Sequence, residues 1–139
     1  MVQTVSEIMT QDVVRLQVDT TLDQAAKVMR DEDIGDVVVI DNDRLVGLVT
    51  DRDIVVRAVA DGLTPAATTV GSVVSRDPVT VRPDDSATSA ALLMRERAVR
   101  RLLVCDEQGL VGIVSIGDLA VDLDPNSVLG GISGAAPNN

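Results

Sequence analysis

The sequence of 139 residues contains no phenylalanine, tyrosine, tryptophan or histidine. Without aromatic rings there is no side chain on which bases could stack, which argues against the common single-stranded nucleic-acid modules. The absence of histidine removes Ser-His triads, histidine general bases and histidine metal ligands together. No other catalytic constellation is visible, so we predict that the chain is not an enzyme and expect no metal site.

Basic residues are also scarce, with 12 Lys and Arg against 22 Asp and Glu and a net charge of -10. This balance disfavours non-specific binding to DNA or to anionic membranes. No apolar run approaches the length of a membrane span, and the first residues lack the features of a signal peptide. We therefore expect a cytoplasmic protein with neither nucleic acid nor membrane as a partner. The single cysteine, Cys105, lies in an apolar run and is predicted to be a small core residue.

What the sequence does have is an internal repeat. Residues 5–54 align with residues 70–119 at a constant offset of 65, and roughly 15 of the 50 aligned pairs are identical. The period is too long for a solenoid unit and short for an ordinary domain. Apolar residues make up 45% of the chain, enough for an aliphatic core. We predict one globule with pseudo-twofold symmetry, in which any pocket at the junction of the repeats occurs twice.

Hydrophobic periodicity predicts the order β-α-β-β-α in each repeat, and hence an α/β (α+β) fold. In the first repeat the expected elements are an extended piece Val13–Val18, a helix Leu22–Glu32 capped by Thr21, strands Val37–Asp41 and Leu45–Thr50, and a closing helix Asp51–Ala60. In the second they are Val79–Val81, a helix from Ser86 to about Arg97, strands Leu102–Asp106 and Leu110–Ser115, and a closing helix Ile116–Leu123. The expected domain plan is repeat 1 at 1–62, a linker at 63–69, repeat 2 at 70–123 and a small-residue tail at 124–139.

The last strand of each repeat runs into its closing helix through the signature G-h-V-[ST]-x-x-D, at Gly47–Asp53 and at Gly112–Asp118. One reading is helix capping. The hydroxyl residue would be the N-cap, and the acid three positions later would return the bond in a capping box.

The other reading of the signature is a phosphate and ribose site. A strand-to-helix turn leaves N–H groups free at the positive end of the helix dipole, where an anion is favoured. The hydroxyl of Thr50 or Ser115 could donate to that anion, and an acid one turn later could accept the hydroxyls of a ribose. The two readings are compatible for Thr50 and Ser115. They compete for Asp53 and Asp118, because an acid bonded to its own cap is less available to a sugar.

Two copies of this plan, each with the same signature, resemble a tandem pair of cystathionine β-synthase (CBS) domains. The segments typical of that family are Leu48–Val55, Val5–Thr10 and Asp77–Val81. The resemblance covers about residues 3–122. The chain is similar to short stand-alone CBS-pair proteins of bacteria, some of which are linked to stress or hypoxia.

The resemblance implies an adenosine nucleotide of the AMP, ADP or ATP type as ligand, with no required cofactor. CBS pairs bind such nucleotides in two clefts between the repeats, where the signature acid holds the ribose and the Ser or Thr lies near the phosphate. Carried over, one cleft would use Thr50, Asp53, Gly35, Asp36, Val37, Asp77, Pro78 and Val79. The other would use Ser115, Asp118, Arg100, Arg101, Leu102, Gln11, Asp12 and Val13.

The two clefts differ in charge. Gly35–Asp36 aligns with Arg100–Arg101, and Asp51–Arg52 aligns with Ile116–Gly117. A phosphate near Asp36 and Asp51 would be repelled, and Arg52 would offset this repulsion only in part. A phosphate near Arg100 would gain charge-assisted hydrogen bonds. We therefore favour the cleft with Ser115 and Asp118 as the anion site. The alternative is that these arginines form a solvated face paired with nearby acids.

Two functions remain open at this stage. The first is a regulatory module that binds an adenosine nucleotide and changes its shape or its affinity for a partner. The second is a ligand-independent structural or interaction module, whose aliphatic helix faces associate and whose tail could contact an unknown protein partner. The resemblance leads us to expect a homodimer.

Overall fold

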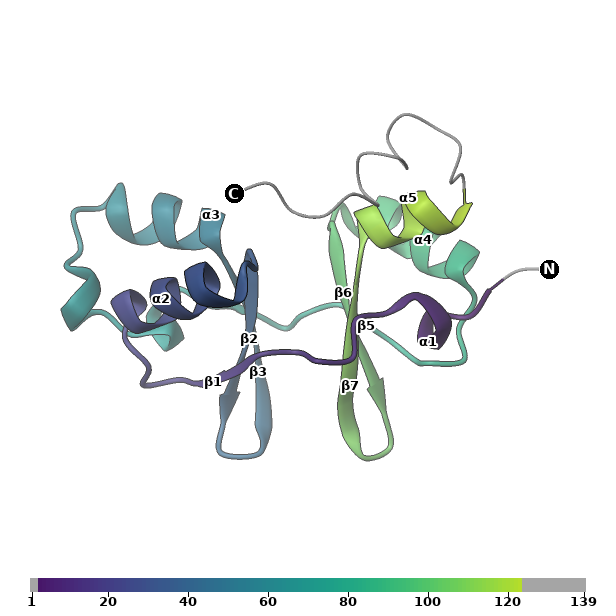
Figure 1. Cartoon of the computed structure of the whole chain (residues 1–139), viewed down its shortest axis with the longest axis horizontal. Coiled ribbons are helices and arrows are strands. Elements are labelled where there is room, and N and C mark those ends of the chain that lie inside the picture. Colours follow the sequence, from purple (N-terminus) through teal and green to yellow (C-terminus); the bar gives the residue numbers. More distant parts are fainter. Residues whose placement is uncertain (1–2, 124–139) are drawn as a thin grey trace. The chain divides into compact units, whose positions relative to one another are not determined.

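The computed structural model describes residues 3–123 (Figure 1). The chain forms two compact units, one of residues 14–78 and the other of residues 3–13 together with residues 79–123. The opening segments of the repeats, Val5–Met9 and Val70–Val74, are therefore exchanged, since each packs in the unit that holds the sheet of the other repeat. The tail expected at 124–139 lies outside the described residues.

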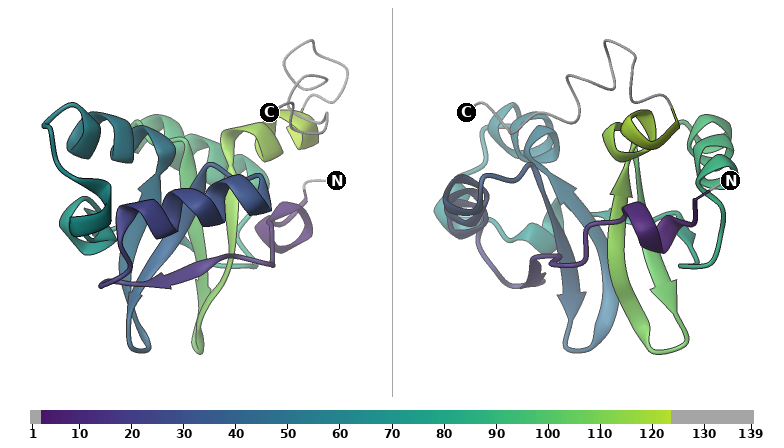
Figure 2. Two further views of the ribbon diagram at one scale, coloured as in Figure 1. Left: turned by 60° about the vertical axis from the view of Figure 1, so that its left-hand side comes forward. Right: turned by 45° about the vertical axis from the view of Figure 1, so that its right-hand side comes forward.

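The unit of residues 14–78 contains a four-stranded sheet in the order β1-β2-β3-β4. Its elements are β1 (Arg15–Gln17), α2 (Leu22–Glu32), β2 (Asp36–Asp41), β3 (Arg44–Thr50), α3 (Asp51–Ile54), a π-helix (Val55–Val59), 3-10 helices at Pro65–Ala67 and Val70–Ser72, and β4 (Ser75–Arg76). Strand β1 is parallel to β2, and the other neighbouring pairs are antiparallel. In Figure 2, α2 and α3 lie on the same side of this sheet.

Helix α2 confirms the predicted bounds, and its ends show why. The Thr21 amide donates to Gln24 Oε1 at 3.2 Å in a capping box, and Asp33 ends the helix in the left-handed conformation with φ 58°. The closing helix of this repeat differs from the prediction of one helix over Asp51–Ala60. It is α-helical only to Ile54 and continues as the π-helix, in a stretch rich in β-branched valines, which are poor α-helix formers.

The other unit contains a three-stranded sheet in the order β5-β6-β7. Its elements are α1 (Val5–Ile8), β5 (Thr80–Val81), α4 (Ala87–Arg97), β6 (Arg101–Asp106), β7 (Gly109–Ser115) and α5 (Ile116–Leu123). The helix and strands of the second repeat are thus confirmed to within about one residue. None of the helices described is long and apolar enough to cross a membrane.

Strands β5, β6 and β7 repeat β1, β2 and β3 in order and in register, whereas only the first sheet has a fourth strand, β4, among the described residues. Val38 pairs with Leu48, and their copies Leu103 and Ile113 pair in the same way. The β2–β3 hairpin has an irregularity after Val39, and the β6–β7 hairpin has one at the equivalent position. The sequence repeat is therefore a structural repeat in these strands, whereas the closing helices differ.

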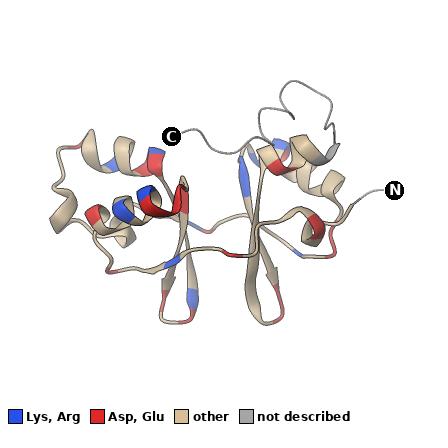
Figure 3. Cartoon of the chain, viewed as in Figure 1, with Lys and Arg blue, Asp and Glu red and all other residues tan. Residues whose placement is uncertain are grey.

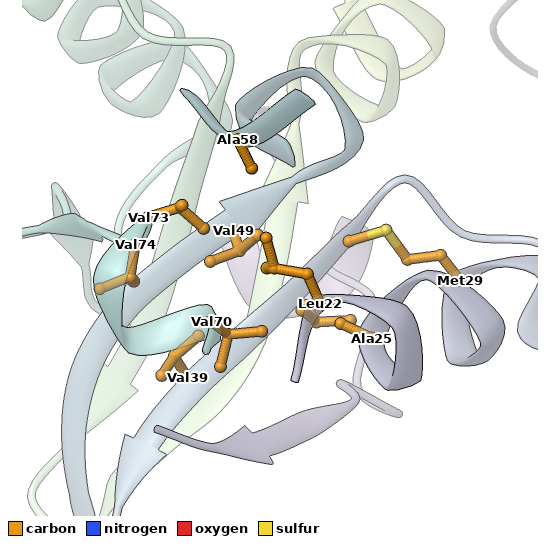
Figure 4. Close-up of a cluster of buried hydrophobic side chains, with 10 residues drawn as sticks. Leu22, Ala25, Met29, Val39, Val49, Ala58, Val70, Val73 and Val74 are labelled. Carbon is orange, nitrogen blue, oxygen red and sulfur yellow. The ribbon is translucent and has the colours of Figure 1, made fainter. Parts of the chain in front are cut away.

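Each unit has its own aliphatic core, drawn from both repeats. In the unit of residues 14–78, Leu22 and Ala25 of α2 pack with Val49 of β3 and with Val70 of the second repeat's opening segment (Figure 4). Val5 of the first opening segment is likewise buried in the core of the other unit. The opening segment of each repeat is therefore part of the core formed by the sheet and helices of the other repeat.

The signature glycines allow the opening segments to pass close to the sheets. A Cβ at Gly47 would lie 2.0 Å from the Ser75 carbonyl oxygen, because β4 pairs with β3 at this point. A Cβ at Gly112 would lie 2.5 Å from Met9 Sδ and 2.9 Å from the Thr10 carbonyl oxygen. Any larger residue would displace the crossing chain, which gives the glycine of the signature a packing role.

Candidate functional site

The signature forms the same hydrogen-bonded turn in both repeats. The Thr50 amide donates to Asp53 Oδ2 at 2.9 Å, and the Asp53 amide donates to Thr50 Oγ1 at 3.1 Å. Ser115 and Asp118 make the matching bonds at 2.8 and 3.1 Å. The capping interpretation is therefore confirmed in both repeats, and each bond to a carboxylate uses one of its two oxygens.

The turn of the first repeat also satisfies its remaining N–H groups. The Asp51 amide donates to the Gly35 carbonyl at 2.9 Å, and the Arg52 amide donates to Asp51 Oδ1 at 2.8 Å. With the two bonds of the capping box, all four amides from Thr50 to Asp53 have partners within the chain. This differs from the expectation of free N–H groups, because the Asp51 carboxylate lies where an anion would have to bind.

The turn of the second repeat lacks that internal anion. The Ile116 amide donates to the Arg100 carbonyl at 2.8 Å, as its counterpart does in the first repeat. Ile116 itself replaces Asp51, so no carboxylate at this position can accept the Gly117 amide. In the first repeat the equivalent amide, that of Arg52, donates to the Asp51 carboxylate. In the second repeat Ile116 offers no such acceptor to the Gly117 amide.

The charges beside the two turns are opposite. Asp36 of β2 is the register partner of Thr50, whereas Arg101 of β6 is the register partner of Ser115. Arg100, which precedes β6, is exposed. Figure 3 shows the acidic residues around the start of α3 and the basic residues at the start of β6. The second turn therefore combines a helix N-terminus with two arginines, an environment suited to an anion.

The structure places the whole of the second predicted set of site residues in one unit, and all of the first set except Val79 in the other. Gly35, Asp36 and Val37 lie at the start of β2, level with the end of β3, and Leu102 lies level with the end of β7. The segments predicted to contact the adenine lie farther along the sheets.

Asp77 and Pro78 follow β4, whose pairing takes the chain from Leu48 to Gly47 and so away from Thr50. Gln11, Asp12 and Val13 follow Thr10, which bridges to Ile113, and they too lead away from the turn. Val79 begins the other unit and is not grouped with Asp77. The acid and the hydroxyl of each signature are therefore close together. The roles of Asp77–Val79 and Gln11–Val13 in binding the adenine stay predictions.

The unit of residues 14–78 also has an open hollow of about 390 Å³ between α2 and the start of the closing helix. Its lining residues are Ala26, Met29, Arg30, Asp33, Ile34, Asp51, Ile54 and Val55. This hollow was not predicted. The helical periodicity of Ala26 and Met29 indicates only an apolar face, and no residue pattern shows that this face is incompletely covered.

Cys105 is half-buried in β6, so the prediction of a core residue holds only in part. Burial, and then the neighbouring Asp106 carboxylate, raises the pKa of its thiol. A raised pKa lowers the fraction of nucleophilic thiolate at neutral pH. Within residues 3–123, no group of three or more His, Cys, Asp or Glu side chains is arranged to hold a metal ion.

The repeated fold and its signature agree with a family model. The model of the CBS domain matches the chain twice, at residues 5–59 and 70–123. The chain belongs to the CBS domain family. Stand-alone proteins with two CBS domains are regulatory modules without enzymatic activity, and CBS pairs can bind adenosine ligands.

Relatives of the same size support this assignment. The CBS domain-containing protein YhcV of Bacillus subtilis is 37% identical over 129 residues, covering 91% of this chain and 89% of its own. Hypoxic response protein 1 of Mycobacterium tuberculosis is 37% identical over 127 residues, with the same coverage of 91% and 89%.

Solved structures agree with the fold as well. The crystal structure of Hypoxic Response Protein I with two coordinated zinc ions aligns with a TM-score of 0.75 and 37% identity, covering 85% of this chain and 97% of that one. A hexameric CBS-CP12 protein from bloom-forming cyanobacteria aligns with a TM-score of 0.79 and 29% identity, covering 92% of this chain and 74% of that one. Self-association is thus a property of related CBS proteins.

Proposed function

We propose that this protein is a cytoplasmic regulatory module that binds an adenosine nucleotide of the AMP, ADP or ATP type at the turn between β7 and α5. The observation that carries the proposal is the charge reversal beside the two turns. Arg101 is the register partner of Ser115, where the first repeat places Asp36 opposite Thr50. An anionic ligand would be attracted to the second turn and repelled from the first.

The groups at this turn suit the parts of a nucleotide. The phosphate would lie near the Ser115 hydroxyl and the first turn of α5, with charge-assisted hydrogen bonds from Arg100 or Arg101. The ribose hydroxyls would donate to the carboxylate of Asp118, which uses only Oδ2 in its bond to the Ser115 amide. The base would lie on the segment Gln11–Val13, which is exposed or half-buried, because the structure buries Leu102 completely. No cofactor is required for this function.

A thermal-shift screen tests the proposal. The purified full-length protein is heated with AMP, ADP, ATP, S-adenosylmethionine or NADH, each with and without Mg²⁺. A ligand at 100 times its dissociation constant adds about 2.7 kcal/mol to the free energy of unfolding, which is a visible shift. We expect a selective, dose-dependent rise with an adenosine nucleotide. The absence of a shift with any of them at millimolar concentration would contradict the proposal.

Asp118→Ala is expected to abolish the ligand-induced shift and to lower the stability of the ligand-free protein by only about 1 kcal/mol, the usual loss for a helix cap. Asp53→Ala is the matched control, because Asp53 makes the same capping bonds in the first repeat. The control should lose stability without losing the ligand-induced shift. If instead Asp118→Ala unfolds the protein outright, Asp118 is structural and its assignment to the ribose fails.

A second candidate function, as a homodimeric interaction module, is favoured by exposed apolar side chains on the closing helix of the first repeat and just after it. Val55, Val56, Val59 and Leu63 are 57%, 50%, 56% and 42% exposed. Side chains of this kind, gathered on one short segment, mark a protein-protein contact more often than isolated ones do. A second copy of the chain is the occupant that the oligomeric relatives favour.

The double substitution Val55→Asp, Val59→Asp is expected to convert a dimer into a monomer, because it would place charges in the contact. Light scattering coupled to size-exclusion chromatography measures the mass directly. Gln108→Asp, an exposed change in the β6–β7 turn, is the control and should leave the dimer intact. A native mass that equals that of one chain, or a dimer that survives the double substitution, would exclude this surface as the contact.

A further inference from the structure

Arg57 connects the signature acid of the first repeat to the opening segment of the second. Its Nε lies 3.8 Å from Asp53 Oδ1, and its Nη1 donates to the Val73 carbonyl at 2.9 Å. The other carboxylate oxygen, Oδ2, accepts the Thr50 amide. Both oxygens of Asp53 are therefore directed at groups of the chain itself.

Both acceptors of Arg57 are largely buried. The Asp53 side chain is 17% exposed, and Val73 is 3% exposed in the core of its unit. The Arg57 side chain is 48% exposed, so the ion pair alone contributes little to stability, and the hydrogen bond to the carbonyl of buried Val73 carries the connection. A guanidinium can hold two acceptors at once through its rigid fork of donors. Arg57 therefore joins the closing helix of the first repeat to the opening segment of the second, 16 residues farther along the chain.

The second repeat has no arginine at the equivalent position. At the offset of 65, Asp122 stands at the position of Arg57, so the counterpart of the cation is an acid. The backbone differs too, because Arg57 lies in the π-helix whereas the closing helix of the second repeat is α-helical over Ile116–Leu123. π-turns are rare and often occur at functional positions. The two candidate acids thus have different surroundings.

We infer that Arg57 is an internal occupant of the first repeat's candidate site, which makes that site a structural clasp and leaves the chain with one nucleotide site. A ribose at Asp53 would have to compete with the guanidinium, and a phosphate would find the amides from Thr50 to Asp53 already bonded. The single site, at Ser115 and Asp118, rests on the proposed function. The clasp does not, because it requires no ligand.

Hydrogen exchange of the ligand-free protein tests the clasp. Arg57→Leu should accelerate amide exchange in Val73–Arg76 severalfold and lower the melting temperature by several degrees. Arg44→Leu, which removes the same charge at the exposed β2–β3 turn, should do neither. Arg57→Lys should restore part of the protection. Exchange at the unmutated rate in Arg57→Leu would overturn the clasp.

A double substitution tests whether Arg57 acts through Asp53. If the two side chains work as one unit, Asp53→Asn combined with Arg57→Leu should lower the melting temperature by less than the sum of the single changes. Simple additivity would overturn the connection between them.

Isothermal titration with AMP and with ATP tests the single site. We expect one nucleotide per chain, with an affinity unchanged in Asp53→Asn and lost in Asp118→Asn. Two nucleotides per chain, one of which disappears in Asp53→Asn, would overturn the inference while leaving the proposed function intact. If the unmutated protein binds neither nucleotide, the proposed function and the single site both fail, and the exchange experiment still decides the clasp.

Discussion

Gly47→Ala is expected to lower the free energy of unfolding by about 1–3 kcal/mol, the usual cost of overpacking, and to detach β4 from β3. The new Cβ would lie 2.0 Å from the carbonyl oxygen of Ser75 and 2.9 Å from its carbonyl carbon. Both atoms are backbone, so no side-chain rotation can relieve the clash. The opening segment of the second repeat would have to move away from the sheet that it completes.

Urea denaturation followed by circular dichroism measures the loss, and amide exchange at Ser75 and Arg76 reports the detachment. Gly35→Ala is the matched control, because its new Cβ would meet the end of the Asp51 side chain at 3.3 Å, which can rotate away. Gly112→Ala should fall between them, since its closest contact is the flexible Met9 side chain at 2.5 Å. A Gly47→Ala protein as stable as Gly35→Ala would show that the opening segment does not pass this close.

The local elements could be predicted because their causes are local. Helix α2 has a capping threonine, an apolar stripe and a stop within its own segment, and its observed bounds equal the predicted ones. The capping box of Ser115 and Asp118 likewise depends on residues three positions apart. The offset of 65 then carried each of these predictions from one repeat to the other.

The exchange of the opening segments could not be predicted in the same way. The bridge from Thr10 to Ile113 and the pairing of β4 with β3 join distant parts of the chain. Short strands of two residues carry almost no periodicity. The signal that was present is the repeated glycine of the signature, which the capping interpretation did not use and which the close approach explains.

The difference in charge between the two candidate sites was predicted, but the sites also differ in their internal hydrogen bonds and side-chain contacts. Asp51 accepts the Arg52 amide, and Arg57 reaches Asp53 from the π-helix. Both contacts depend on side-chain conformations and on a helix type that the sequence pattern does not reveal. The sequence could therefore indicate which turn carries the positive charge. It could not indicate that the amides of the other turn are already hydrogen-bonded within the chain.

Leu22→Ala is expected to lower the free energy of unfolding by about 2–5 kcal/mol, the range for a buried leucine in a core that cannot collapse. Leu22 is fully buried, and it packs in a cluster of aliphatic side chains from α2, β3 and the opening segment of the second repeat (Figure 4). Since the chain has no aromatic residues, the largest fully buried side chains within residues 3–123 are leucines such as this one. The small valines around it can fill little of the space left behind.

Thermal and urea unfolding measure the loss, with Leu92→Ala as the control because Leu92 is a helical leucine that is 51% exposed. The control should change stability by less than about 0.5 kcal/mol, as surface substitutions do. Leu22 also lies next to the point where the opening segment joins the unit, since its amide donates to the Thr68 carbonyl at 2.8 Å. The cavity should therefore also speed amide exchange at Val70–Val74, whereas unchanged exchange there would mean that the segment is held by its backbone bonds alone.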